Sequence, residues 1–277
     1  MTIPKRTLGR TGVEVTHLGL GGEGILRTFG HEREAYALIN RALDLGVTYC
    51  ESARAYSGSE AYYGQALRER RREVFLTSKS HARDRKGALA HLHETLRAMQ
   101  TDHLDLWQIH DMRTSRDIET VFGPDGAIQA FIEAREQGKV RFIGVTGHEN
   151  PFIIRECLER FDFDTVLLPL NPAESQSPSF LEHVVPLARE KGMGIIGMKV
   201  YLHGFASRIP GYTRIEPFLR YALTQPLSTV VIVCDDLLQM EENVRYAAVF
   251  EPMTTEELRD MEKFVAPYAR QLMYYRP

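Results

Sequence analysis

Three ionisable side chains stand at the ends of three consecutive apolar runs in this sequence. Glu51, Lys79 and His110 each close such a run. If the runs are parallel strands of a closed barrel, their carboxyl ends meet around one rim, where barrels of this kind carry their active sites. Tyr56 lies five residues beyond Glu51, in a segment that would return over the same rim. The pattern therefore predicts that four functional side chains converge.

A tyrosine beside a lysine is an arrangement suited to proton transfer. The pKa of an unperturbed tyrosine is about 10, and a nearby ammonium favours the phenolate and lowers that pKa. We therefore expect Tyr56 to act as a general acid near neutral pH. Glu51 would hold Lys79 charged and oriented, and His110 would bond a carbonyl oxygen. None of these groups can deliver a hydride, so carbonyl reduction would need a nicotinamide or a flavin.

Two other interpretations of these side chains stay open. Each residue taken alone is more often structural, and the set could be a structural ion-pair network, which also perturbs pKa values. Lys79 could also be the Schiff-base amine of a lyase or an isomerase on the same barrel. The presence of Tyr56 and His110 beside it favours reduction.

The elements that would position these side chains alternate between short apolar runs and helical segments. Most of the runs do not alternate with polar residues, which is typical of parallel strands buried on both faces. Amphipathic segments separate several of them, which indicates βαβ units. The apolar runs occupy residues 18–20, 47–50, 74–77, 104–109, 142–145, 165–168, 193–198 and 228–232. The helical segments occupy residues 34–43, 89–99, 127–135, 181–189, 237–248 and 256–268.

These units predict a single (β/α)8 barrel domain over residues 1–277, an α/β fold of the TIM-barrel class. A closed barrel is favoured because an open sheet would leave two edges to cover. Two short runs, 6–8 and 13–16, flank a glycine-containing turn and predict an N-terminal β-hairpin. The segment 256–268 predicts an extra C-terminal helix.

The composition is that expected of a cytoplasmic globular protein. The chain is 43% hydrophobic and 26% charged, and its net charge of −3 includes no basic stripe, so nucleic acid is not an expected partner. Cys50, Cys157 and Cys234 form no C-x-x-C pair, so we expect neither a disulfide framework nor a zinc site. We also expect no signal peptide and no membrane span, because no apolar run of sufficient length occurs.

Beyond these patterns, the sequence resembles the aldo-keto reductases over nearly its whole length. One matching segment contains Glu51 and Tyr56 and resembles the first signature of that family. A second, with the sequence GKVRFIGVT, resembles its second signature. The others resemble its N-terminal hairpin and its C-terminal cofactor segment. The matching segments are residues 6–15, 42–67, 138–146 and 231–243.

The resemblance implies a function and a set of roles. The family's catalytic Asp, Tyr, Lys and His carry over by position to Glu51, Tyr56, Lys79 and His110. An NAD(P)H-dependent reductase of a small aldehyde or ketone is implied, with Tyr56 as the proton donor and no metal.

The sequence departs from the family at the carboxylate and around the cofactor. Glu51 replaces the family's Asp and is longer by one C–C bond of about 1.5 Å. If that replacement is strained, Asp at position 51 should raise the rate. Thr146 stands where the family often has a Ser-Asn pair. Leu167 replaces a Gln that binds the nicotinamide carboxamide, with Asn171 as a nearby polar group. Lys199 lies near the expected pyrophosphate path, which predicts a phosphate contact.

The C-terminal segment concerns the choice of cofactor. The family binds the 2′-phosphate of NADP with basic residues there, whereas this chain has Val233 and Gln239 at the matching positions. Charge alone would allow NADH, and family habit favours NADPH, which we expect. Glu51 and Leu167 motivate an alternative, a nucleotide-binding sensor or structural subunit without useful catalysis. The segment's predicted cofactor-binding residues are Val233, Cys234, Asp235, Gln239, Glu242 and Asn243.

Overall fold

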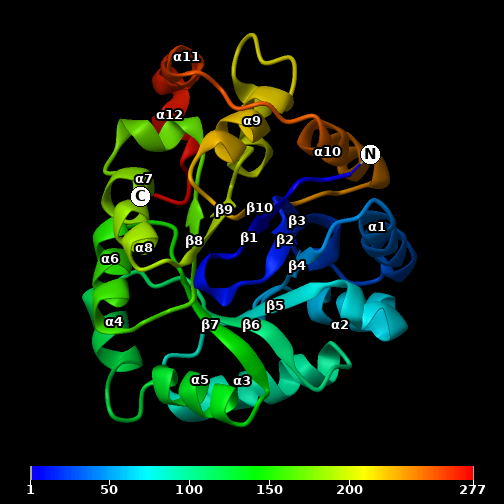
Figure 1. Ribbon diagram of the computed structural model, residues 1–277, viewed down its shortest axis with the longest axis vertical. Coiled ribbons are helices and arrows are strands. Elements are labelled where there is room, and N and C mark those ends of the chain that lie inside the picture. Colours follow the sequence, from blue (N-terminus) through cyan, green and yellow to red (C-terminus); the bar gives the residue numbers. More distant parts are fainter. Residues whose placement is uncertain (1, 277) are drawn as a thin grey trace.

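The strands form one closed barrel. The computed structural model describes residues 2–276, and eight parallel strands close in the order β10-β3-β4-β5-β6-β7-β8-β9 (Figure 1). Each of these strands is paired on both sides, as predicted for a (β/α)8 barrel. The strands are β3 (Leu18–Leu20), β4 (Tyr49–Glu51), β5 (Phe75–Ser80), β6 (Leu104–Ile109), β7 (Val140–Thr146), β8 (Thr165–Pro169), β9 (Gly194–Met198) and β10 (Thr229–Ile232).

The predicted β-hairpin is present and covers the amino-terminal end of the barrel. β1 (Lys5–Thr7) and β2 (Glu14–Thr16) are antiparallel, with a 3-10 turn, η1 (Gly9–Thr11), between them. Gly9 has a φ of +52°, and a Cβ there would lie 2.2 Å from the backbone nitrogen of Gly194, so this close approach to β9 requires glycine. Figure 1 shows the hairpin in blue across the strand ring. The carboxyl ends of the strands lie at the opposite end.

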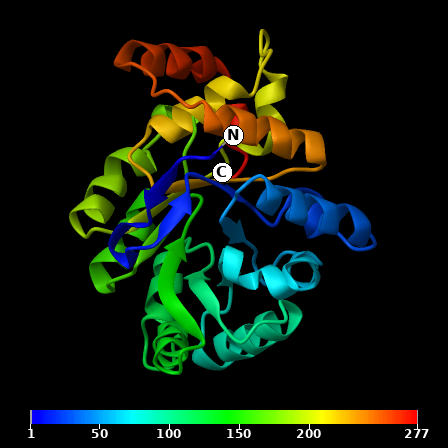
Figure 2. The ribbon, with the colours of Figure 1, turned by 45° about the vertical axis from the view of Figure 1, so that its right-hand side comes forward.

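Helices lie outside the strand ring. In Figure 2 the blue, cyan and teal helices, α1 to α3, follow one another along one side of it. All six predicted segments contain helix, and α2, α4, α6, α9 and α12 occur where the sequence analysis placed none. The α-helices are α1 (Glu32–Asp44), α2 (Ser59–Leu67), α3 (Arg85–Ala98), α4 (Ser115–Val121), α5 (Ala127–Glu136), α6 (Pro151–Arg160), α7 (Phe180–His183), α8 (Val185–Glu190), α9 (Glu216–Thr224), α10 (Leu237–Ala248), α11 (Thr255–Val265) and α12 (Ala269–Leu272). The remaining 3-10 segments are η2 (Gly24–Arg27), η3 (Arg68–Glu73), η4 (Pro172–Gln176), η5 (Leu202–Arg208) and η6 (Ala266–Tyr268).

Two predicted helices are divided by the structure. The segment 181–189 is broken at Val184, between α7 and α8. Pro186 follows at the start of α8, where its missing N–H could not have continued the hydrogen bonding of α7. The predicted C-terminal helix is confirmed as α11, but it ends at Val265 and continues only as short helical turns.

The barrel interior is filled by apolar side chains. Leu106, Leu167 and Ile196 belong to one buried cluster, which Leu8 and Val15 of the hairpin region complete at the amino-terminal end. Full burial of an aliphatic side chain of this size contributes about 1.5–3 kcal/mol. The barrel is therefore a packed core and not a channel.

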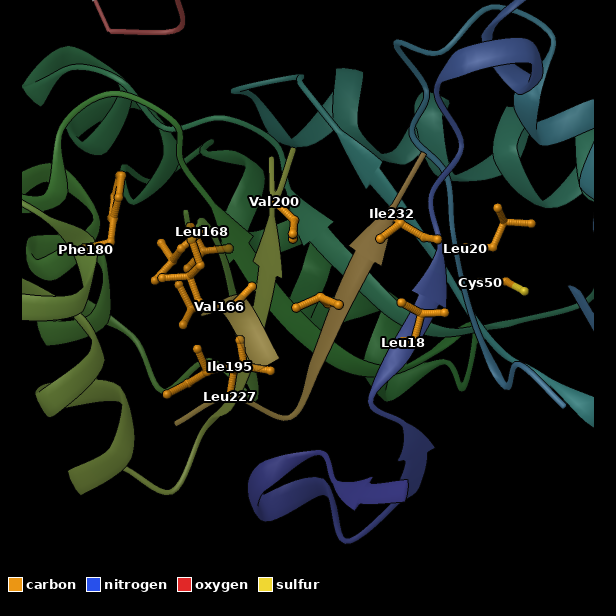
Figure 3. Packing of buried hydrophobic residues seen from close by; sticks show 14 of the residues in the cluster. Leu18, Leu20, Cys50, Val166, Leu168, Phe180, Ile195, Val200, Leu227 and Ile232 are labelled. Carbon is orange, nitrogen blue, oxygen red and sulfur yellow. The ribbon is translucent and has the colours of Figure 1, made fainter. Parts of the chain in front are cut away.

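A second apolar layer separates the strands from the helices. Figure 3 shows Val166 and Leu168 of β8 on the side that faces Phe180 of α7, with Ile195 of β9 beside them. All four side chains are buried. This layer fixes the helices to the strands, and so fixes the loops that follow the strands.

The three cysteines of the chain are buried. Cys50, Cys157 and Cys234 are free thiols, and burial raises the pKa of each to about 12. The thiols therefore stay protonated at neutral pH.

Among residues 2–276, no helix is both long enough and apolar enough to cross a membrane.

Candidate active site

The structure brings the four predicted catalytic side chains together at one end of the barrel. Glu51 is the last residue of β4, Lys79 lies in β5, and His110 directly follows β6. Nζ of Lys79 lies 4.9 Å from the centre of the Tyr56 ring. The Tyr56 and His110 rings are nearly perpendicular, with centres 5.8 Å apart. The predicted convergence is therefore present, at the end opposite the hairpin.

A buried ion pair forms the base of this group. Nζ of Lys79 lies 2.7 Å from Oε1 of Glu51 and also donates a hydrogen bond of 2.9 Å to the carbonyl oxygen of Ser52. Lys79 is only 1% exposed and Glu51 only 4%. Removing one partner of such a pair leaves an uncompensated buried charge, at a typical cost of about 3–5 kcal/mol. The pair therefore holds the ammonium in one position.

The surroundings of Tyr56 keep the phenol protonated in the free protein. Burial raises the pKa of Tyr56 well above its ordinary value, and the carboxylates of Glu23 and Glu51 raise it further. The pKa of Tyr56 is therefore raised in the free protein and not lowered as expected, because burial outweighs the nearby positive charge. Burial, followed by the charge of Lys79, lowers the pKa of His110 well below its ordinary value. His110 is therefore neutral at neutral pH.

A cleft of about 630 Å³ begins at Tyr56 and Glu51 and crosses the ends of β9, β10 and β3 to reach α10. Lys199, just beyond the end of β9, also lines it. The predicted cofactor residues that line it are Val233, Asp235, Gln239, Glu242 and Asn243.

The remaining predicted cofactor residues are not among those that line the cleft. Oγ1 of Thr146 accepts a hydrogen bond of 2.8 Å from a backbone amide of the loop after β6. Nδ2 of Asn171 donates to the carbonyl oxygen of Lys199 at 3.2 Å and to the phenol of Tyr275 at 2.9 Å. Cys234 is buried. The side chains of Thr146 and Asn171 are thus hydrogen-bonded to other parts of the protein.

Comparison with known protein families shows what kind of protein carries this site. The sequence profile described as the Aldo/keto reductase family matches residues 17–211, which is more than half of the chain. The chain belongs to the aldo/keto reductase family. It is therefore an oxidoreductase, as its motifs predict.

Several known proteins resemble this aldo/keto reductase along almost their whole length. The uncharacterized oxidoreductase YqkF of Bacillus subtilis is 23% identical, over 93% of this chain and 95% of that protein. L-galactose dehydrogenase of Arabidopsis thaliana is 24% identical, over 96% of this chain and 95% of that protein. The holo form of aldo-keto reductase AKR11C1 from Bacillus halodurans superposes with a TM-score of 0.79 at 24% identity, over 95% of this chain and 96% of that one. An aldo-keto reductase from Klebsiella pneumoniae in complex with NADPH superposes with a TM-score of 0.78 at 18% identity, over 97% of each chain. These likenesses establish the fold.

Three side chains of this aldo/keto reductase reach the site although the sequence analysis did not select them. The guanidinium carbon of Arg27 lies 5.1 Å from the centre of the Tyr56 ring, and Arg27 pairs with Glu23 at 2.6 Å. Both residues line the cleft. Nε2 of Gln108 donates a long hydrogen bond of 3.4 Å to Oε2 of Glu51. The candidate site is thus supported by residues outside the recognised signatures.

The glycines on either side of Glu23 are the sequence feature that could have indicated this part of the site. Gly24 has a φ of +65°, and a Cβ there would lie 2.7 Å from Cγ1 of Val233 and 2.8 Å from the carbonyl oxygen of Cys234. The chain after β3 therefore passes the segment after β10 too closely for a side chain at this position. Glycines directly after a buried strand indicate such a close approach of backbone.

Proposed function

We propose that this protein reduces an aldehyde or a ketone to an alcohol with NAD(P)H, and that Tyr56 donates the proton. The observation that carries this proposal is the position of the Tyr56 ring, which lines the cleft and whose centre lies 4.9 Å from Nζ of the buried Lys79. Reduction adds a hydride to the carbonyl carbon and a proton to the carbonyl oxygen. The site therefore needs a hydride donor and one acid.

Tyr56 is suited to be that acid even though its pKa is raised. Hydride addition turns the carbonyl oxygen into an alkoxide, which is a far stronger base than a phenolate. The proton therefore moves from Tyr56 only as that charge develops. The ammonium of Lys79 then stabilises the phenolate that remains, and Glu51 keeps the ammonium in place.

His110 is suited to orient the carbonyl oxygen. Its neutral imidazole can donate one hydrogen bond without competing with Tyr56 as the acid. Its ring lies against the edge of the Tyr56 ring, with centres 5.8 Å apart. A carbonyl oxygen held by both groups would be fixed in the direction of proton transfer, which is the positioning that raises rates most.

The cleft fits a nicotinamide dinucleotide. Its volume of about 630 Å³ lies within the range of about 300–1,000 Å³ that is usual for small-molecule sites. Gly21, Gly22 and Gly24 leave bare backbone along its edge. A bound nicotinamide would supply the hydride that no side chain here can supply. We propose that the far end of the cofactor is held by Val233, Asp235, Gln239, Glu242 and Asn243.

The charges at that far end favour NADH over NADPH. Asp235 and Glu242 line it, and Val233 and Gln239 stand where the resemblance implies basic residues. Carboxylates repel a 2′-phosphate, and they accept hydrogen bonds from ribose hydroxyls. The preference for NADPH that family habit implies stays a prediction, and the Kd values for the two cofactors decide between them.

The test is a panel of aldehydes and ketones, assayed with NADH and NADPH for the parent protein and for Tyr56→Phe. We expect turnover by the parent and a loss in kcat of at least about a hundredfold in the variant, which is within the usual range for general acid catalysis. The Kd for the cofactor should change little, because the ring is kept. Tyr36→Phe, at an exposed tyrosine of α1, is the matched control.

Two outcomes would contradict the proposal. Equal rates for the parent and Tyr56→Phe would remove Tyr56 from the mechanism. Cofactor binding without turnover of any carbonyl compound would favour the sensor, the interpretation that Leu167 in the barrel interior supports.

A further inference from the structure

The mouth of the barrel carries one ammonium without a carboxylate partner. Glu51 pairs with Lys79 at 2.7 Å, and Glu23 pairs with Arg27 at 2.6 Å. In the loop after β6, Asp111 pairs with Arg113, whose Nε lies 2.6 Å from Oδ2.

Lys199 is the exception. It lines the same cleft as Tyr56, and within residues 2–276 no carboxylate oxygen lies within 4.0 Å of its Nζ. Lys199 is therefore the ammonium at the mouth that no carboxylate contacts in the described part of the chain.

The C-terminal residues hold this ammonium from one side. Nζ of Lys199 donates a hydrogen bond of 3.1 Å to the phenol oxygen of Tyr274. It also lies 5.3 Å from the centre of the Tyr274 ring and 5.0 Å from that of Tyr275, within the range of cation–π attraction. Tyr274 in turn contacts His203 and Phe205 of η5, with ring centres 5.5 and 5.3 Å apart. These rings make a wall on which Lys199 rests.

The wall is itself anchored. The Tyr275 phenol donates a hydrogen bond of 2.8 Å to Oε1 of Glu174 and accepts one from Asn171. Arg276 forms an ion pair with the same carboxylate. Asn171 also holds the carbonyl oxygen of Lys199, whose φ of +56° is unusual for a residue with a side chain. The backbone of Lys199 and the tyrosines that contact its ammonium are therefore fixed by one network.

The position of Lys199 favours a role toward the substrate and not toward the cofactor phosphates. The charges that act most on its ammonium are Glu23, Asp111 and Arg27, and the same three act on Tyr56. Asp235 and Glu242, at the far end of the cleft, are not among them. The ammonium also contacts Tyr274, whose ring packs against His203, and His203 lines the same cleft as Tyr56.

We propose that Lys199 binds an anionic group of the substrate, so that the preferred substrates are carbonyl compounds that also carry a carboxylate or a phosphate. This inference rests on the proposed reduction, in which the carbonyl oxygen lies at Tyr56 and His110. Lys199, which contacts Tyr274, would bind the anionic group at the other end of the substrate. A half-buried ammonium without a counterion strongly favours such a ligand, because binding restores charge balance where water is partly excluded.

The experiment compares two aldehydes that differ in charge but little in shape, 4-carboxybenzaldehyde and methyl 4-formylbenzoate. We expect the parent to prefer the acid in kcat/KM, and Lys199→Met to reduce the acid-to-ester ratio by about tenfold to a hundredfold, the range for a hydrogen bond to a charged group. Lys199→Arg should keep most of the preference. Lys263→Met removes an exposed lysine of α11 and should leave the ratio unchanged. Melting temperatures of all variants show whether they fold.

A binding measurement separates this inference from the proposed function. Calorimetric titration of both aldehydes into the protein saturated with oxidised cofactor requires no turnover. Tighter binding of the acid, lost in Lys199→Met, would support the anion site even if no carbonyl compound were reduced. Equal binding of acid and ester by the parent would overturn it. So would a Lys199→Met variant that binds the cofactor at least tenfold more weakly with an unchanged acid-to-ester ratio, because the ammonium would then serve the cofactor phosphates.

Discussion

Gln108 on β6 is paired in register with Lys79 on β5, and both side chains contact the same carboxylate, Glu51. Nζ of Lys79 lies 2.7 Å from one carboxylate oxygen of Glu51, and Nε2 of Gln108 lies 3.4 Å from the other. The additional methylene of Glu51, compared with the family's Asp, is therefore used to span two partners on neighbouring strands. The site is built around a glutamate.

The first prediction concerns the length of that side chain. Glu51→Asp shortens the reach by about 1.5 Å, so the carboxylate cannot keep both contacts. We expect kcat to fall about tenfold to a hundredfold, the size of effect that a misplacement of about 1 Å produces. Steady-state rates with a saturating aldehyde measure it, with Glu133→Asp, on α5 and not among the residues that line the cleft, as the control. A rise in kcat would show instead that Glu51 is a strained replacement.

The second prediction is the pH profile of the reductase activity. Tyr56 must be protonated to act, and its raised pKa places the loss of activity above pH 10, the ordinary tyrosine value. His110 must be neutral to leave Tyr56 as the acid, and its lowered pKa places the loss on protonation below pH 6.5. We therefore expect kcat/KM for an uncharged aldehyde, which reports the groups of the free enzyme, to be level across neutral pH. A titration between about pH 7 and 9, within the usual range for a tuned acid or base, would contradict this assignment.

The third prediction concerns the cofactor. Gln239 lines the far end of the cleft at a position where the resemblance implies a basic residue. Gln239→Arg should therefore tighten NADPH binding by about tenfold relative to NADH, the gain typical of one added hydrogen bond to a charged group. Fluorescence titration gives both Kd values, and Gln225→Arg, after α9, is the control. An equal change in the two values would place the 2′-phosphate elsewhere.

The fourth prediction concerns stability in acid. His17 is fully buried, and burial lowers its pKa to about 4 from an unperturbed 6.5. The unfolded state then binds more protons between these values, so the stability present above pH 6.5 is lost as the pH falls toward 4. The maximum loss from this group is about 3 kcal/mol.

The variant His17→Gln can keep the hydrogen bond of 3.0 Å between the ring Nε2 and the carbonyl oxygen of Ala247 while removing the titration. Urea unfolding at pH 7, 5.5 and 4 should show a smaller decline for His17→Gln than for the parent. His93→Gln, at an exposed position of α3, should decline like the parent. Parallel declines for the parent and both variants would exclude His17 as the group responsible.

The sequence by itself was sufficient to predict the barrel and the ionisable side chains that converge at its carboxyl rim. Buried parallel strands require apolar runs, and the residue that ends each run must lie at the carboxyl rim once the barrel closes. Glu51, Lys79 and His110 could therefore be placed together from local pattern alone. The strand order follows from the same rule, because successive βαβ units set each strand beside the one before it.

Only the tertiary structure decided how those residues behave. The pKa of Tyr56 depends on burial and on the charge of Glu23. Glu23 follows the first barrel strand in the sequence and comes close to Tyr56 only when the chain is folded. The surroundings of Lys199 depend on Tyr274 and Tyr275, more than seventy positions further along the chain. Electrostatic interactions depend on the distances between groups and on their exposure to water. These distances and exposures are set by packing between segments that are far apart in the sequence. A local pattern of residues therefore cannot predict them.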